Sequence, residues 1–288
     1  MALEIKQRGN ALGYKLLLSI YSIFGYKVVA FFLNFVALYY LFFTPSVKRS
    51  MKSYYSKHGI PFSNKVYFTH IKSFAISILD RFISRIKPQD IIFHTHNEDV
   101  IQELQDGGII LFSHVGGWAS AAYCLQDQLP PMNIIMREST QKKVQDIEQD
   151  YKRYNESLVK IINLNDGALA ANIQIANALI NQELIALMVD RVVNENQVVE
   201  VSFFNTCVRM NKNSFDIALR AKKPLVAIFV MKIDHQEYDL TFNKIHSNTI
   251  QEMAQEYANL LEMILKRYPY QWYNFYDYFY TDTSKIIR

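Results

Sequence analysis

The sequence predicts an α/β fold with a mixed, mainly parallel sheet that is flanked by helices. Short apolar runs alternate with longer segments whose apolar residues recur at helical spacing, as in strands joined by crossover helices. Two of these runs, 109–112 and 184–189, are almost wholly apolar and are typical of buried strands. An N-terminal helical segment, which we expect to associate with a membrane, precedes this fold.

Length and composition limit the class of protein. The 288 residues suit one α/β domain with an appendage, and we divide the chain into an N-terminal membrane segment, 1–58, and an α/β domain, 59–288. The net charge of +4 gives no indication of a nucleic-acid partner. Cys124 and Cys207 form no Cys-x-x-Cys pair, which fits a reducing compartment.

The N-terminal segment contains a stretch, 28–47, without any charged residue. A run of about 20 such residues is long enough to cross a bilayer. Basic residues crowd this part of the chain and favour an anionic lipid surface; they are Lys15, Lys27, Lys48, Arg49, Lys52 and Lys57. Three interpretations stay open: a transmembrane anchor, an interfacial helix that lies in the membrane plane, and a buried core helix.

The elements follow in order from turn residues and periodicity. Thr44-Pro45-Ser46 ends the apolar helix, and Ser46 is a good N-cap for a basic amphipathic helix to Ser56. Gly59-Ile60-Pro61 breaks the chain before a helix over 64–86, and Pro130-Pro131 precedes a strand at 133–136. Further strands are predicted at 91–94, 109–112, 160–164, 184–189, 198–204 and 225–231, with 238–242 antiparallel to the last, and further helices at 118–125, 139–155, 168–181, 216–221 and 248–266.

Chemically useful side chains stand where three of these strands end. His114 follows the strand at 109–112 and precedes Gly116-Gly117 and a helix, Arg137 follows the strand at 133–136, and Asp190-Arg191 follows the strand at 184–189. Ligands of open α/β sheets bind at this edge, and the helix N-terminus adds unpaired N–H groups. His114 is therefore a candidate site residue, with a satisfied core histidine as the alternative.

The string Ser113-His114-Val115-Gly116-Gly117-Trp118 resembles the first motif of bacterial lipid A biosynthesis (lauroyl/myristoyl) acyltransferases, His-x-Gly-x-x-Glu. This family lies within the His-x4-Asp/Glu lysophospholipid acyltransferase superfamily. The other matching strings follow in the family's order, at 66–82, 184–191, 198–205 and 268–279, and the aromatic ending at 268–279 suits either lipid contact or core packing.

The resemblance implies transfer of a fatty acyl chain from acyl carrier protein, or acyl-CoA, to a hydroxyl or amine of a lipid or glycolipid such as a lipid A precursor. His114 is then the general base, and the bacterial inner membrane, at its cytoplasmic face, is the expected location. Arg137, Arg191 and Trp118 are expected to bind substrate, with the N–H groups of Gly116 and Gly117 contributing to an oxyanion site. Neither a metal nor a cofactor is required.

Ala119 departs from the family's pattern, because it occupies the position of the acid that orients the histidine. Asp190 is a candidate to replace that acid in part, and a catalytically disabled, lipid-binding or accessory homologue is the alternative. A hydrolase with Ser113 or Ser120 as nucleophile lacks the Gly-x-Ser-x-Gly elbow.

For other polar residues we expect structural roles. We expect His70 and Asp80 to have structural partners, and His94-Thr95-His96 to be an exposed strand edge rather than a metal site. The string 208–215 replaces the family's glycine and prolines, so a loop of different shape is expected there.

Overall fold

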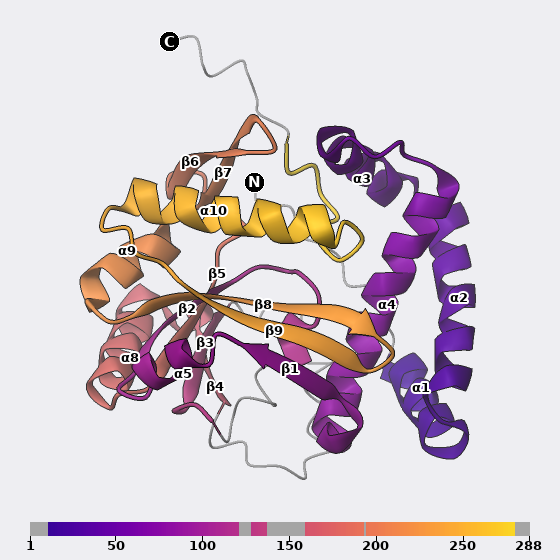
Figure 1. The fold of residues 1–288 in the computed structure, drawn as a ribbon, viewed down its shortest axis with the longest axis horizontal. Helices are drawn as coiled ribbons and strands as arrows, with labels where there is room; N and C mark the ends of the chain where they lie inside the picture. The colour runs from indigo at the N-terminus through magenta and orange to yellow at the C-terminus, as the bar shows by residue number, and fades with distance from the viewer. Residues whose placement is uncertain (1–10, 121–127, 137–158, 193, 280–288) are drawn as a thin grey trace.

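The computed structural model describes residues 11–120, 128–136, 159–192 and 194–279, and Figure 1 shows its fold. Seven described strands form the large sheet, in the order β1-β9-β8-β2-β5-β3-β4. Their bounds are β1 Ile92–His96, β2 Gly108–Phe112, β3 Met132–Met136, β4 Val159–Asn163, β5 Leu184–Met188, β8 Leu225–Asp234 and β9 Glu237–Lys244. All neighbours pair in parallel except β8 and β9, which confirms the mixed, mainly parallel sheet.

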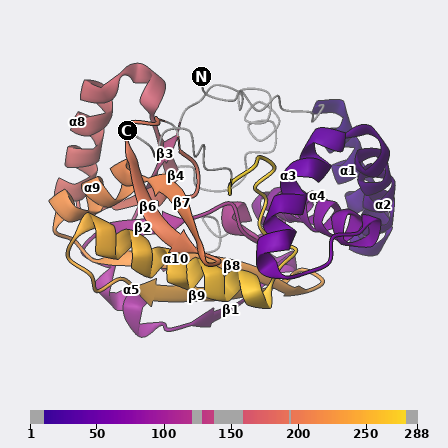
Figure 2. The same ribbon diagram turned by 90° about the horizontal axis from the view of Figure 1, so that it is seen from above.

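Helices gather at both ends of this sheet. Both ribbon views place α1 to α4 together at one end, away from α8 and α9 at the other, while α10 crosses a face of the sheet (Figures 1 and 2). The helices are α1 Ala11–Phe24, α2 Tyr26–Phe43, α3 Pro45–His58, α4 Asn64–Ile86, α5 Asp99–Glu103, α8 Ala168–Ile180, α9 Lys212–Ala221 and α10 Ile250–Arg267, with short 3-10 turns at Pro88–Asp90 and Leu164–Asp166.

Strand β2 shows why its sequence is apolar at every position. Ile109 and Leu111 belong to the core on one face of the sheet, with α10, whereas Ile110 belongs to the core on the other face, with α4. Side chains alternate between the faces of a strand, so burial on both faces requires a continuous apolar run. These three residues have no exposed surface.

The segment after Phe203 differs from the sequence prediction. The string 208–215 is not a loop, because β6 Val198–Phe203 pairs antiparallel with β7 Thr206–Asn211, and α9 follows at once. Phe204 and Asn205 make the two-residue turn with positive φ of 48° and 54°, which is the geometry of a type I′ hairpin. Phenylalanine is a rare residue for this conformation, so the turn lacked its usual sequence signal.

One helix boundary differs from the prediction, and two predicted helices lie partly or wholly outside the described residues. The N-cap of α3 is Thr44 rather than Ser46, because Pro45 takes the first helical position, where its missing N–H costs nothing. Residues 118–120 are helical as expected. The rest of that predicted helix and the helix predicted at 139–155 lie outside the described residues.

Candidate active site

Strand register brings His114 and Asp190 together. β2 and β5 are parallel neighbours near the centre of the sheet, and Phe112 is opposite Met188. Two residues further along each strand the same offset aligns His114 with Asp190. The N–H of Val189 donates to the Phe112 carbonyl at 3.0 Å, so the two chains stay side by side beyond the strands.

The Asp190 carboxylate binds His114 twice. Nδ1 of the ring lies 2.8 Å from Oδ1, and the backbone N–H of His114 donates to Oδ2 at 2.9 Å. Asp190 has no exposed surface, whereas the His114 side chain keeps 15% of its surface. Because a buried carboxylate accepts hydrogen bonds, Nδ1 carries the proton in the neutral ring and Nε2 keeps a free lone pair.

Electrostatics keep this pair poised as neutral imidazole and carboxylate. Burial lowers the pKa of His114; Arg191 lowers it further, while the Asp190 charge opposes the shift. Burial alone would raise the pKa of Asp190, but the His114 charge and hydrogen bonds, with Arg191, lower it on balance. His114 is therefore unprotonated at Nε2 near neutral pH, as a general base must be.

Asp190 is the acidic partner of His114 that position 119 does not provide. Ala119 offers no carboxylate, yet Nδ1 of His114 already has an acidic partner from β5. The backbone carbonyl of Asp190 also accepts a hydrogen bond from the Tyr276 hydroxyl at 2.7 Å. The geometry thus contains an oriented histidine without an acid five residues further on.

Gly116 and Gly117 do not contribute their N–H groups to an oxyanion site, so that expectation is wrong. The N–H of Gly116 donates to the Gln271 carbonyl at 2.8 Å, and that of Gly117 donates to the Val230 carbonyl at 2.7 Å. A Cβ on Gly116, at φ +54°, would lie 1.9 Å from the Val230 oxygen. Gly116 is thus needed for the close approach of the loop to β8, and a Cβ on Gly117 would lie 2.5 Å from the Tyr238 ring of β9.

The C-terminal segment holds the site in a way that the sequence analysis missed. Trp272 is almost fully buried, and its indole N–H donates to Oδ2 of Asp190 at 3.2 Å. The N–H of Tyr273 donates to the His114 carbonyl at 2.7 Å. The aromatic ending therefore packs in the core at Trp272 and Tyr273 rather than against lipid. The string Pro-Tyr-x-Trp, which matched the family's ending, was the available signal.

A second buried histidine, His70, forms a hydrogen bond to the backbone of Trp272. Nε2 of His70 lies 2.8 Å from the Trp272 carbonyl, which can only accept, so Nε2 donates. Nδ1 then accepts from the Tyr55 hydroxyl at 2.7 Å. Burial lowers the pKa of His70 to about 3, so the ring is neutral. His70 has the structural partners that the sequence analysis expected.

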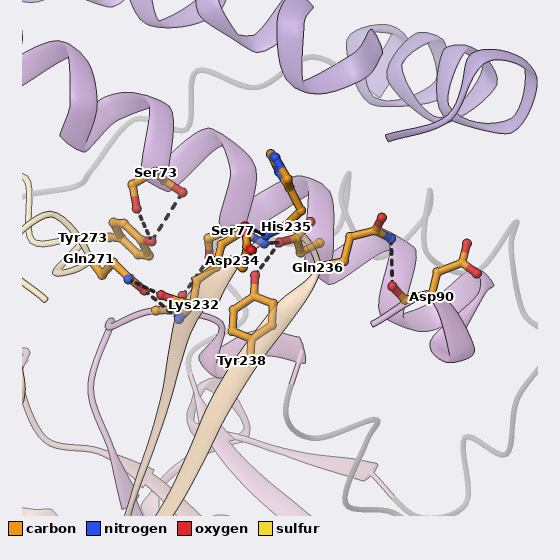
Figure 3. A network of polar contacts seen from close by, with 12 residues as sticks. Ser73, Ser77, Asp90, Lys232, Asp234, His235, Gln236, Tyr238, Gln271 and Tyr273 are labelled. Carbon is orange, nitrogen blue, oxygen red and sulfur yellow. Dashed lines mark hydrogen bonds and ion pairs between the residues drawn. The ribbon is translucent and has the colours of Figure 1, made fainter. Parts of the chain in front are cut away.

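A polar network lies beneath the His114 loop. Figure 3 shows Gln271 beside Lys232 and Ser73 beside Tyr273, where Gln271 accepts from the Lys232 N–H at 2.9 Å and donates to its carbonyl at 2.8 Å. Ser77 donates to the Gly116 carbonyl at 2.8 Å. Asp80 is buried with structural partners, as expected: Lys232 at 2.7 Å and the Tyr238 hydroxyl.

The other residues predicted for the site differ in whether the structure places them beside His114. The ring of Trp118 meets the His114 ring edge-on at 5.5 Å between centroids. Arg191 is half-buried, and its Nε has no hydrogen-bond partner. Arg137 lies outside the described residues. Ser113 and Ser120 have no exposed surface, and Ser113 is bonded to the Tyr257 hydroxyl at 2.7 Å, so neither is placed as an accessible nucleophile.

His94 and His96 pair with carboxylates of the neighbouring strand. Nε2 of each lies 3.2 Å from Glu237 and from Asp239, respectively, at the exposed surface. Within the described ranges no group of three or more His, Cys, Asp or Glu residues is arranged to hold a metal ion.

The fold is α/β, and the family match identifies the chain as an acyltransferase. The sequence model of the bacterial lipid A biosynthesis acyltransferase family matches residues 69–281, and the chain belongs to that family. Its structure is similar to the 1-acyl-sn-glycerophosphate (LPA) acyltransferase PlsC of Thermotoga maritima, with 10% sequence identity, a TM-score of 0.39, and coverage of 90% of this chain and 97% of that one. Comparison with curated proteins gives no match.

Proposed function

We propose that this acyltransferase moves a fatty acyl chain from acyl carrier protein, or from acyl-CoA, to a hydroxyl or amine of a glycolipid such as a lipid A precursor. The observation that carries the proposal is the hydrogen bond between Nδ1 of His114 and Oδ1 of Asp190, 2.8 Å long. It supplies an oriented base at the carboxyl edge of the sheet although Ala119 stands at the usual acid position.

In the proposed reaction, Nε2 of His114 takes the proton of the acceptor hydroxyl or amine as its oxygen or nitrogen attacks the thioester carbonyl. The tetrahedral intermediate then collapses with cleavage of the C–S bond, and the leaving thiolate receives that proton from Nε2. Asp190 holds the ring in the right tautomer and stabilises the transient imidazolium. The step needs neither a metal nor a redox cofactor.

Arg191 is the described residue best suited to the developing negative charge. The N–H groups of Gly116 and Gly117 are already occupied, whereas Nε of Arg191 is buried without a partner. Its charge is also close enough to lower the pKa of His114. We assign Arg191 to the oxyanion or an anionic headgroup, and Arg137, which follows Met136 in the sequence, to the headgroup. Trp118 is assigned to the substrate side of the His114 ring.

Family membership also supports the proposed location, the cytoplasmic face of the bacterial inner membrane. Acyl carrier protein, or coenzyme A, delivers the acyl chain from the aqueous side, and the acceptor is a membrane lipid. Donor and acceptor thus meet at the membrane surface.

The test is acyl transfer from radiolabelled acyl carrier protein to a bacterial lipid extract, with acyl-CoA as a second donor. We expect turnover by the wild-type chain and a loss of about 10³ to 10⁴ in kcat with Asp190→Asn, because the wrong tautomer is then favoured. His114→Ala is expected to abolish turnover. His96→Ala and Asp239→Asn are matched controls, since they form a similar pair at the surface, 3.2 Å apart.

Ala119 favours one other candidate, a disabled homologue that binds lipid without turnover. Ala119→Glu distinguishes the two. If wild type turns over and Ala119→Glu adds nothing, Asp190 is sufficient. Activity only in Ala119→Glu, or in none of the variants with either donor, would contradict the proposed function.

A further inference from the structure

Helix α2 is apolar on two opposite sides. Tyr26, Val29, Leu33 and Ala37 are buried against the rest of the protein. The side chains on the other side are exposed, among them Phe31, Phe32, Phe35, Tyr39, Phe42 and Phe43. The period of 3.6 residues per turn places these two sets on opposite faces of the helix. A soluble protein rarely leaves so many large apolar side chains together in water.

The buried face of α2 fixes the helix along α4. Figure 1 shows α2 running beside α4 as the outer layer at this end of the sheet. Near the carboxyl end of α2, Thr44 Oγ1 lies 2.6 Å from the Tyr67 hydroxyl of α4. At the amino end, the ring of Tyr26 lies 6.0 Å from that of His235 and 5.5 Å from Lys232 Nζ. Both ends of α2 are thus attached to the enzyme domain.

This attachment is incompatible with a spanning helix. If α2 crossed the bilayer, the elements packed along its length would enter the hydrocarbon with it. Midway along α4, Ser73 bonds to the Tyr273 hydroxyl and Ser77 to the Gly116 carbonyl, so the catalytic loop and the charged Asp190 beside it would enter as well. Charged groups and open sheet edges are excluded from lipid by the cost of unsatisfied polar groups.

The charge of the chain identifies the surface that covers the exposed face. Residues 1–79 contain ten Lys or Arg and one acid, Glu4, giving net +9, while residues 80–288 contain 21 Lys or Arg and 26 acids, giving net −5. Lys27, in the first turn of α2, and Arg49, Lys52 and Lys57, in α3, are exposed. A basic, aromatic-rich flank fits an anionic bilayer surface.

We infer that α2 lies flat in the interface of an anionic membrane, with its Phe-rich face in the acyl region and α3 at the headgroups. Helix α4 then separates the bilayer from the catalytic loop. On its other side α4 contacts that loop, since Ser77 donates to the Gly116 carbonyl at 2.8 Å. A lipid acceptor needs to rise by only about one helix diameter, ~10 Å, to reach the loop.

The first test is flotation with vesicles of phosphatidylglycerol and phosphatidylcholine, compared with phosphatidylcholine alone. The double variant Phe35→Ser, Phe42→Ser removes two side chains that are 55% and 71% exposed, and we expect the partition coefficient to fall about tenfold or more. The matched control is Leu169→Ser, Ile180→Ser on α8, whose side chains are 76% and 77% exposed. Its binding should equal that of wild type.

Charge is tested separately. Arg49→Gln with Lys52→Gln should weaken binding to the anionic vesicles, as should added salt, while leaving binding to phosphatidylcholine unchanged. Equal binding of wild type to both vesicles, or equal loss in the α8 control, would overturn the inference. Concentration-dependent dimerisation that protects Phe35 in the absence of lipid would assign the face to a second copy instead.

Depth measurements distinguish a flat helix from a spanning one. Fluorescent labels on F31C, F35C and F42C, in a background with Cys124→Ser and Cys207→Ser, report their depth through lipid-borne quenchers. A flat helix gives one shallow depth at all three positions. An upright helix separates positions 31 and 42 by ~16 Å, at 1.5 Å per residue, and that result would overturn the inference. None of these readouts depends on acyl transfer, so they can fail independently of the proposed function.

Discussion

The indole N–H of Trp272 and the His114 backbone N–H share one acceptor, Oδ2 of Asp190, at 3.2 and 2.9 Å. The other carboxylate oxygen is thereby left to Nδ1 of His114. Three donors, two from His114 and one from Trp272, fix a carboxylate that has no exposed surface. Asp190 can thus remain charged in the interior and align the histidine.

Trp272→Phe is expected to reduce kcat about tenfold and to lower the free energy of unfolding by about 1.5 to 3 kcal/mol. The variant removes one hydrogen bond to a buried charge and leaves the aromatic packing nearly intact. Steady-state kinetics and urea unfolding measure the two effects. Tyr278→Phe is the control, since the Tyr278 hydroxyl is buried without a hydrogen-bond partner, 4.8 Å between ring centroids from Trp272. Equal losses in both variants would mean that Trp272 acts through packing alone.

The sheet could be predicted from the sequence because local composition determines most of it. Ile109 to Leu111 are buried on both faces of the sheet and must therefore be apolar. Such continuous apolar runs make parallel strands recognisable in the sequence. The β6–β7 hairpin could not be predicted, because its turn uses Phe204 at φ +48°. That conformation depends on tertiary support, including a hydrogen bond from the Phe204 N–H to Glu262 at 2.5 Å.

The site could be predicted only where a reactive side chain directly follows a predicted strand. His114 and Asp190 both follow buried runs, and parallel pairing with a common offset places them side by side. Trp272 lies in an irregular segment, and only the three-dimensional fold shows that it reaches Asp190. The oxyanion prediction for Gly116 and Gly117 was wrong. The sequence does not reveal that their N–H groups donate to carbonyls of Gln271 and of β8. The division of the chain at residue 58 stays a prediction.

The pH dependence of kcat/KM should show a loss of activity on the acid side, with its midpoint below 6.5. Burial lowers the pKa of His114, and the base is active only when neutral, so activity rises with pH through this pKa. Arg191→Met should move the midpoint to higher pH, because the variant removes a cation that lowers the pKa of His114. Arg209→Met, in the β6–β7 hairpin, should leave the midpoint unchanged. A midpoint above 6.5 in wild type would contradict this assignment.

Gly116→Ala should abolish the folded loop and with it the activity. The new Cβ would lie 1.9 Å from the Val230 carbonyl oxygen, a backbone atom that cannot move aside easily, at a φ of +54°. Gly59→Ala isolates the conformational part of this cost, since Gly59 has a φ of +80° but nothing within 4 Å of a Cβ. We expect about 1 kcal/mol for Gly59→Ala and several for Gly116→Ala, measured by urea unfolding. Similar values for the two would exclude the close approach to β8.

His70 should make the protein less stable as the pH falls below about 6.5. Its pKa is about 3 in the folded protein and has the ordinary value of 6.5 in the unfolded chain. Between these values the unfolded chain binds one more proton at this residue, so the contribution to stability is complete above pH 6.5 and declines toward pH 3. The slope approaches about 1.4 kcal/mol per pH unit.

His70→Gln keeps a side-chain N–H for the Trp272 carbonyl but does not titrate. Urea unfolding at pH 5.5 and 7.5 should therefore show a smaller difference for His70→Gln than for wild type. Equal differences would mean that the folded and unfolded states bind the same number of protons at His70, which would contradict the neutral ring assigned to the folded protein.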